Sequence, residues 1–209
     1  MFTKETAFTW YTKAAAKMSE HKEELHDLDA AIGDGDHGIN MDRGFTWLLQ
    51  AVPEMQNLRL GEVLKTSGMI LLSSVGGASG PLYGTLFLKG SATVGERDAL
   101  TSSELFAFFD VGVAALVTRG RTKSGDKTMY DTWEPMLLEY KKQLESGATM
   151  VEIMRACVDA AAAGMTATIP MLAQKGRASY LGERSIGHQD PGATSSFYLI
   201  QALYESIRE

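Results

Sequence analysis

Apolar residues recur along the chain at intervals of three and four positions, the spacing that places side chains on one face of an α-helix. No run of alternating polar and β-branched apolar residues predicts a strand. We therefore expect an all-α fold of eight helices, and their mostly short connections favour neighbours that run up and down. The expected helices cover about 3–28, from 39 to Pro53, 61–75, from Pro81 onward, 101–118, 133–144, 149–164 and 191–207.

Two of these helices carry a capping box at their start, Thr101 with Glu104 and Thr149 with Glu152. No linker divides the chain, so we expect a single domain over residues 1–209. The two longer irregular segments, about 120–127 and 173–190, contain glycine and charged residues. Function is expected in such loops when the rest of a protein is helical.

The composition narrows the function classes. The 20 Lys and Arg residues are outnumbered by 26 Asp and Glu residues, and this acidic balance argues against a nucleic-acid partner. The lone Cys157 and the absence of a secretory leader make the cytoplasm the expected compartment. Residues 66–88 carry no charge, but many are Gly, Ser or Pro, so we expect no membrane span.

An acidic segment separates the first two expected helices. Asp29, Asp34 and Asp36 lie within eight residues, and neighbouring glycines allow the backbone to turn tightly. Close carboxylates repel one another unless a cation lies among them, and oxygen ligands favour Mg²⁺ or Ca²⁺. An EF-hand is excluded because its twelfth position would be Phe45, where a Glu is needed.

Two other interpretations of the acidic segment stay open. It can be a solvated Asx-turn loop, or a structural Ca²⁺ site in a helical scaffold. His37 can position a phosphate or cap the following helix, and Asn40 can contact a ligand or merely occupy the first turn.

A second segment, residues 76–85, is rich in glycine and joins the third and fourth expected helices. Small residues let backbone N–H groups approach an anion, and a helix N-terminus adds partial positive charge. It is not a Walker A loop, which needs Gly-Lys-Ser/Thr and a preceding strand. A tight interhelical turn explains Gly76 and Gly77 but not Gly80 and Gly84 together.

The irregular segments 120–129 and 175–193 supply basic residues that could pair with a polyphosphate. For Lys123, Lys127 and Arg184, a solvated loop position is favoured over direct contact. Met129 can cover an adenine face or belong to the core.

Four motifs in order along the chain resemble the nucleotide-binding L subunit of bacterial dihydroxyacetone kinases. They are Asp29 with residues 32–40, residues 77–84, residues 125–129 and residues 176–193. The resemblance implies an antiparallel barrel of eight helices with the nucleotide site in loops at one end. It implies two Mg²⁺ ions held by Asp29, Asp34 and Asp36. The implied contacts to ADP or ATP are His37, Gly38, Ile39, Asn40, Ala78, Ser79, Gly120, Met129, Arg177, Asp190, Pro191 and Gly192.

The resemblance also implies an enzyme subunit. It would pass the terminal phosphoryl group of bound ATP to dihydroxyacetone on a separate K subunit. A phosphohistidine-carrying M subunit of the phosphotransferase system would recharge the ADP in place. We expect no catalytic residue and no sugar-binding half in these 209 residues, because phosphoryl transfer can rest on positioning and metal ions. The alternative is a nucleotide-sensing module that docks a transcription factor.

Overall fold

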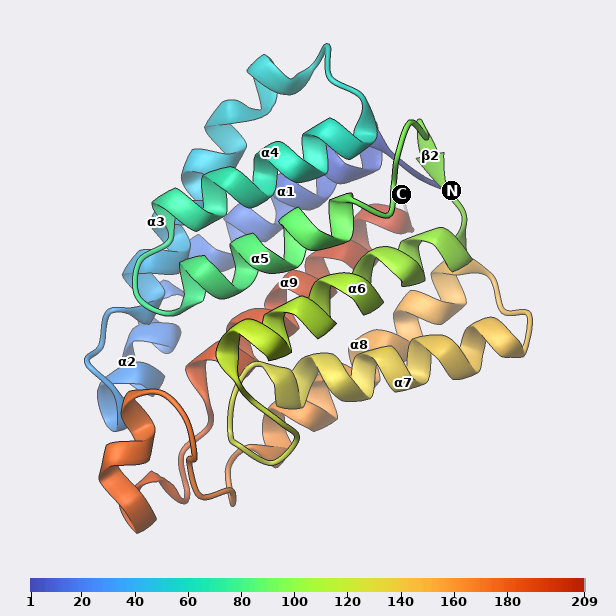
Figure 1. Cartoon of the computed structure of the whole chain (residues 1–209). Coiled ribbons are helices and arrows are strands. Elements are labelled where there is room, and N and C mark those ends of the chain that lie inside the picture. Colours follow the sequence, from blue (N-terminus) through green and yellow to red (C-terminus); the bar gives the residue numbers. More distant parts are fainter. Residues whose placement is uncertain (209) are drawn as a thin grey trace.

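The computed structural model describes residues 1–208 and confirms the all-α class (Figure 1). Two short strands, β1 (Phe2–Thr3) and β2 (Ala99–Leu100), pair antiparallel near the N-terminus. Two 3-10 helices, η1 (Val52–Met55) and η2 (Arg177–Ser185), lie between longer helices. The α-helices of the described residues are α1 (Lys4–Glu20), α2 (Lys22–Ile32), α3 (His37–Ala51), α4 (Leu60–Ser74), α5 (Ser79–Ser91), α6 (Ser102–Gly120), α7 (Tyr130–Glu145), α8 (Met150–Ala167) and α9 (Pro191–Ile207).

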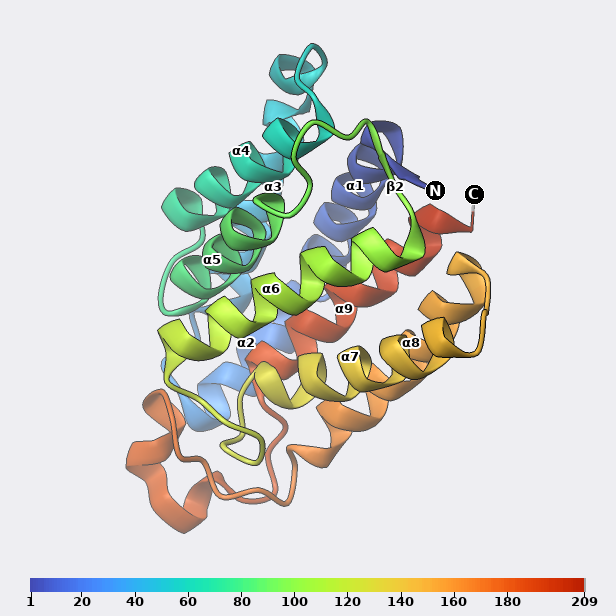
Figure 2. The same ribbon diagram turned by 45° about the vertical axis from the view of Figure 1, so that its right-hand side comes forward.

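Eight of these helices close into a ring. Each packs against its neighbour in the order α1, α3, α4, α5, α6, α7, α8, α9, and α9 packs back against α1. Successive helices run in opposite directions, as Figure 2 shows from a second side. The remaining helix, α2, extends α1 beyond one end of the ring and packs mainly against α3.

The first expected helix is therefore divided. The break lies at His21, whose backbone leaves the helical range. The His21 ring stacks on Tyr198 of α9 with centroids 4.0 Å apart, and its Nδ1 lies 2.9 Å from a Glu24 carboxylate oxygen. This contact with a residue far along the chain redirects the helix, and periodicity near residue 21 does not reveal it.

Aromatic side chains fill the inside of the ring. Trp10 of α1 stacks on Phe87 of α5 with centroids 5.2 Å apart, and Phe109 of α6 stacks on Trp133 of α7 at 5.8 Å. The Trp10 indole donates to the Leu199 carbonyl of α9 at 2.9 Å. All these side chains are fully buried, so burial of large apolar area inside the ring is the main source of stability.

Because the ring helices alternate in direction, four connections meet at one end. They are residues 33–36, 75–78, 121–129 and 168–190, and each overlaps one of the four motifs of the sequence. Both capping boxes form as expected, whereas α5 begins at Ser79, two residues before Pro81. None of the helices described is long and apolar enough to cross a membrane.

Candidate functional site

The three aspartates of the acidic segment lie together at the loop end of the ring. Asp29 belongs to the last turn of α2, and Asp34 and Asp36 lie in the connection to α3. Each offers a carboxylate oxygen, and the three oxygens lie within 4.8 Å of one another. Oxygens gathered so closely form a donor set that suits a hard divalent cation such as Mg²⁺.

Asp29 is fixed by the backbone that it helps to fold. Its Oδ2 accepts the N–H groups of Asp36 at 2.8 Å and His37 at 3.1 Å, at the start of α3. Burial raises the pKa of Asp29, those two hydrogen bonds oppose the shift, and the nearby Asp34 and Asp36 raise it further. A bound cation would relieve this repulsion, so the residues present fit a metal ion.

His26 of α2 is hydrogen-bonded to the acidic loop. The sequence pattern did not single out this residue. Its Nδ1 is hydrogen-bonded to the carbonyl oxygen of Gly35, which lies between two of the aspartates. Gly35 adopts φ +74°, and a Cβ there would lie 3.0 Å from the His26 ring. Glycine is required here both by the backbone angle and by this close approach.

The glycine-rich loop lies directly against the acidic loop. Gly77 adopts φ +62°, and a Cβ there would lie 3.8 Å from Asp36 Oδ1. Arg43 links α3 to the end of α4, because it donates to Asn40 Oδ1 at 2.8 Å and to the Ser74 carbonyl at 2.9 Å. This arrangement gives Asn40 a packing role in addition to any ligand contact.

A buried hydrogen-bond chain runs behind the start of α5. The two ring nitrogens of His37 lie 3.2 Å from Ser79 Oγ and 2.9 Å from Ser195 Oγ. Tyr83 Oη lies 2.8 Å from Ser195 Oγ and also contacts Ser196. Burial lowers the pKa of His37 to about 4, so the ring is neutral near pH 7 and positions Ser79 without adding charge.

These loops enclose a cavity of about 390 Å³. The first turns of three helices, α3, α5 and α9, open onto it. Thirteen of the fifteen predicted site residues line it: Asp29, Asp34, Asp36, His37, Asn40, Ala78, Ser79, Gly120, Met129, Arg177, Asp190, Pro191 and Gly192.

Gly38 and Ile39 are the two predicted residues that do not line this cavity. A Cβ at Gly38 would lie 2.0 Å from the Lys22 carbonyl, so its small size lets α3 approach α2. The Ile39 side chain is 49% exposed. Both N–H groups belong to the first turn of α3, where the helix itself provides no acceptor.

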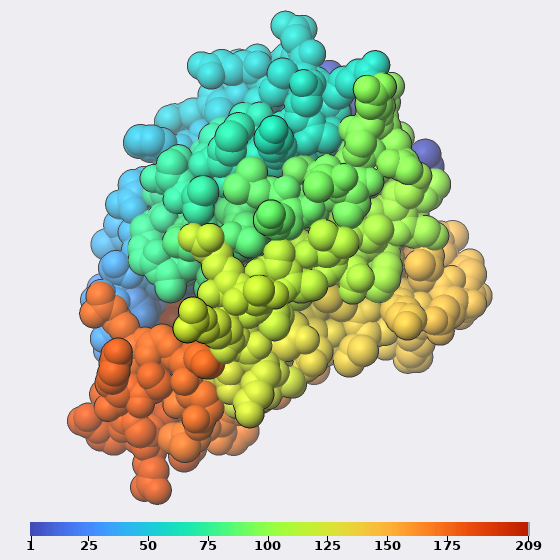
Figure 3. Space-filling view, viewed as in Figure 1, coloured from blue at the N-terminus to red at the C-terminus, as the bar shows by residue number. Residues whose placement is uncertain are grey.

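The segment of residues 170–187, hereafter the 170–187 loop, closes one side of the cavity and contains η2. In the space-filling view it projects in orange beside the yellow-green 120–129 connection (Figure 3). Arg177 Nη2 lies 2.9 Å from Asp34 Oδ2, which links this loop to the acidic loop. A small apolar cluster also packs the loop onto the end of α2 and consists of Ile32, Ala173, Ala178 and Leu181.

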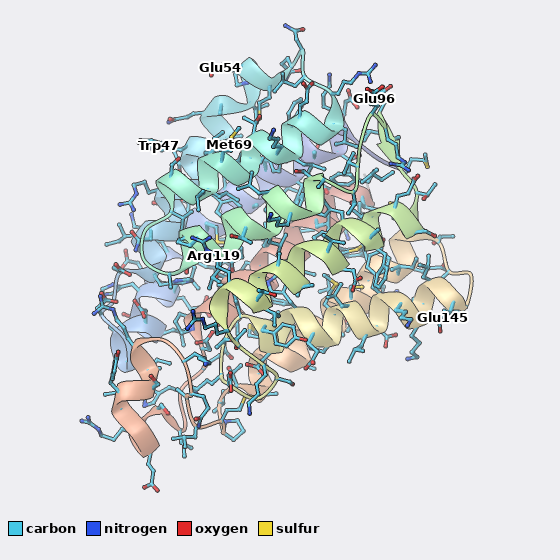
Figure 4. The ribbon with its side chains drawn as sticks, in the orientation of Figure 1. Trp47, Glu54, Met69, Glu96, Arg119 and Glu145 are labelled. Carbon is cyan, nitrogen blue, oxygen red and sulfur yellow. The ribbon has the colours of Figure 1, made fainter. Side chains whose placement is uncertain are left out.

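The basic residues of the loops differ in burial. Lys123 and Arg184 are exposed, as expected, but the expectation of a solvated Lys127 is wrong, because that side chain is only 1% exposed. Arg119, at the end of α6 that faces the loops, also lines the cavity (Figure 4). Met129 both belongs to the core and lines the cavity, so its two interpretations are compatible.

Known proteins share this arrangement. Residues 31–205 match the DAK2 domain family. The chain belongs to that family. It is 44% identical over 200 residues to the ADP-binding subunit DhaL of the PEP-dependent dihydroxyacetone kinase of Escherichia coli (strain K12), covering 96% of this chain and 95% of that protein. It is 42% identical to the ADP-binding subunit DhaL of the PTS-dependent dihydroxyacetone kinase of Lactococcus lactis subsp. lactis (strain IL1403), covering 99% and 100%.

The fold is also found in a solved structure of a family member. The dihydroxyacetone kinase from C. freundii, in complex with AMP-PNP and Mg²⁺, is 25% identical with a TM-score of 0.71. The match covers 97% of this chain and 33% of that one, so the chain spans about a third of that kinase's length. Membership of this family identifies the chain as a phosphotransferase component, and the L-subunit resemblance drawn from its motifs is confirmed.

Proposed function

We propose that this chain holds ADP or ATP with Mg²⁺ in the loop cavity, as the nucleotide-holding subunit of a dihydroxyacetone kinase. The observation that carries the proposal is that three carboxylates and the first turns of α3, α5 and α9 converge on one cavity. Carboxylates suit Mg²⁺, and helix N-termini suit phosphate groups. The relatives named as ADP-binding subunits and the AMP-PNP complex of the C. freundii kinase support this assignment.

We assign two Mg²⁺ ions to Asp29, Asp34 and Asp36. We assign nucleotide contacts to the other predicted residues: His37, Gly38, Ile39, Asn40, Ala78, Ser79, Gly120, Met129, Arg177, Asp190, Pro191 and Gly192. For Gly38 and Ile39 the contact would be through main-chain N–H groups, because neither side chain lines the cavity.

When bound, ATP would supply its terminal phosphoryl group for transfer, leaving ADP, and the Mg²⁺ ions would neutralise phosphate charge. The chain's own residues then act by positioning. Arg177 brings a guanidinium group to the phosphate side of the cavity, and Met129 offers an apolar wall for the base. Positioning and charge neutralisation are the main demands of phosphoryl transfer, so we assign no catalytic acid or base.

The acceptor in this proposal is dihydroxyacetone carried on a separate K subunit. We propose that an M subunit of the phosphotransferase system, carrying a phosphohistidine, recharges the ADP without its release. The names of the relatives, which include PEP-dependent and PTS-dependent kinases, support this donor.

A reconstituted assay tests the proposed function. The purified chain is mixed with K and M subunits, the phosphotransferase components, phosphoenolpyruvate and dihydroxyacetone, with only the nucleotide that the chain carries. We expect dihydroxyacetone phosphate to form while ADP stays with the chain. No product with phosphoenolpyruvate or with added ATP would contradict the kinase role and favour the regulatory alternative, in which the chain docks a transcription factor.

A further inference from the structure

Lys127 is a buried cation at the base of the 170–187 loop. Its side chain is 1% exposed, and its backbone takes the left-handed angle φ +61°. The Nζ donates to the carbonyl oxygens of Thr168 at 2.6 Å, Ile169 at 3.4 Å and His188. All three N–H donors of the ammonium group are therefore used by main-chain acceptors.

The three acceptors lie at the two ends of the 170–187 loop. Thr168 and Ile169 precede the loop, and His188 follows it. The two ends also bond directly, because the Gly187 N–H donates to the Ile169 carbonyl at 2.8 Å. Lys127 thus links the first and last residues of the loop through its ammonium group. This group lies at the C-terminal end of α8, where the helix dipole favours a cation.

The connection that carries Lys127 is itself held in place. The Asp131 carboxylate accepts the N–H groups of Gly125 at 2.6 Å and Thr128 at 2.7 Å. The Asp126 carbonyl accepts the Gln174 N–H from the 170–187 loop at 3.0 Å. The connection that carries Lys127 is therefore hydrogen-bonded both to α7 and to the 170–187 loop.

Residues assigned to nucleotide binding lie on both sides of the Lys127 contacts with residues 168, 169 and 188. Arg177 lies within the loop, Asp190 begins α9 just beyond its exit, and Met129 is two residues from Lys127. The Asp190 N–H donates to Thr168 Oγ1 at 3.0 Å, next to the carbonyl that Lys127 holds. One ammonium group therefore fixes the spacing between three parts of the cavity wall.

We propose that Lys127 is a positioning residue for nucleotide binding, which sets the 170–187 loop and the start of α9 relative to Met129. The proposal rests on the proposed function, because it assigns the nucleotide to this cavity. Removal of the ammonium group breaks the link between the three carbonyls: those of Thr168 and Ile169 keep the N–H groups of Met171 and Gly187, and that of His188 loses this donor. The loop then loses its fixed base, while the aromatic contacts inside the helical ring, such as that of Trp10 with Phe87, are not touched.

The test compares Lys127→Met with Lys123→Met, which removes the same charge from an exposed position in the same connection. Affinity for Mg·ADP is measured by calorimetry at a temperature where circular dichroism shows each variant to be folded. Cleavage by trypsin at Lys175, Arg177 and Arg184 of the 170–187 loop is followed in parallel. Should Lys127→Met fail to fold, Lys127→Gln replaces it, because the amide keeps two N–H donors without the charge.

We expect Lys127→Met to bind Mg·ADP about tenfold more weakly than the wild type, with faster cleavage within the loop. Lys123→Met should match the wild type in both. A Lys127 variant that binds Mg·ADP as tightly as the wild type overturns the proposal, whatever its cleavage rate or thermal stability. If the wild type itself binds no Mg·ADP, the proposed function fails, and the cleavage comparison alone then decides whether Lys127 ties the loop.

Discussion

At the scale of the residue, the Asp29 carboxylate has two roles, one in folding the acidic loop and one in the proposed metal site. One oxygen receives two N–H groups from the start of α3, and the carboxylate also belongs to the cluster with Asp34 and Asp36. The Asp29 carboxylate therefore helps to shape the acidic loop and also offers an oxygen to a cation.

Asp34 is the aspartate whose loss should affect binding most cleanly. It is exposed, and its carboxylate pairs with Arg177 rather than with the backbone. We expect Asp34→Asn to weaken Mg·ADP binding by at least about tenfold, because it removes a charged cation ligand. Calorimetry measures the affinity, and circular dichroism should show an unchanged helical fold.

Asp27→Asn is the matched control for that variant. Asp27 is exposed on α2, the helix that precedes the acidic loop, and does not belong to the cluster. Its substitution should leave the affinity unchanged. An Asp34→Asn protein that binds Mg·ADP like the wild type would contradict the assignment of the metal ions to these carboxylates.

Asp190 gives a prediction about pH. Burial raises its pKa to about 7, against about 4 in an unfolded chain. Between about pH 4 and pH 7, Asp190 is protonated in the folded state and ionised in the unfolded chain. The stability contributed by this group is therefore lost as the pH rises through 7. Asp190 accepts the Ala193 N–H at 2.7 Å, and an Asn side chain at this position can still accept it. Unlike Asp190, the Asn side chain cannot ionise.

We therefore expect the difference in unfolding free energy between Asp190→Asn and the wild type to change with pH. From about pH 5 to pH 8 it should shift by about 2 kcal/mol in favour of the variant. This is less than the full pKa shift would give, because the residue is partly exposed. Urea unfolding at the two pH values measures the difference. A stability gap that stays constant or shrinks as the pH rises would show that Asp190 ionises freely in the folded protein.

Single residues also show the limit of sequence reasoning. The three aspartates were identifiable because like charges at short spacing need a cation. His37 and Asn40 stayed ambiguous, because their partners Ser79, Ser195 and Arg43 include residues far along the chain. The burial of Lys127 depends on carbonyls more than 40 residues away, which no local pattern reveals.

At the scale of the element, α4 and α5 pack closely against each other at glycine residues. A Cβ at Gly84 would lie 2.7 Å from Leu72 Cβ and 2.9 Å from the Gly68 carbonyl. The backbones of the two helices therefore touch, and neither can move away without opening the ring. This close packing explains Gly84, which a simple interhelical turn does not require, and Gly68, which faces it across the contact.

Gly84→Ala should lower the free energy of unfolding by about 2 kcal/mol, because the added methyl group forces the helices apart. Gly120→Ala, at the end of α6, is the matched control, since the nearest atom to its Cβ would be the flexible end of Leu82 at 3.3 Å. Denaturant unfolding compares the two variants. An equal effect of both would mean that helix propensity, not packing, governs these positions.

Element boundaries followed the sequence where their signals are local. Both capping boxes formed, with the Thr101 and Thr149 hydroxyls accepting the N–H groups of Glu104 and Glu152. The break at His21 was missed because Tyr198, 177 positions later, stabilises it. Within the expected irregular segment 173–190, the 3-10 turns of η2 also had no periodic signal.

At the scale of the whole molecule, the site exists because the ring brings four connections to one end. Helix periodicity predicted the elements and their alternation but not which helices touch. The eight-helix barrel came from the resemblance to the L-subunit family, and the ring of helices agrees with it. The single domain over residues 1–209 and the individual site residues stay predictions.

Metal-dependent nucleotide binding at the acidic loop can be measured by calorimetric titration of the nucleotide-free wild-type chain with ADP, first in excess Mg²⁺ and then in excess EDTA. We expect saturable binding of one nucleotide per chain with Mg²⁺, and a loss of most of that affinity when EDTA removes the metal. Absence of binding in Mg²⁺, or an affinity that EDTA leaves unchanged, would contradict a metal-dependent nucleotide site at the acidic loop.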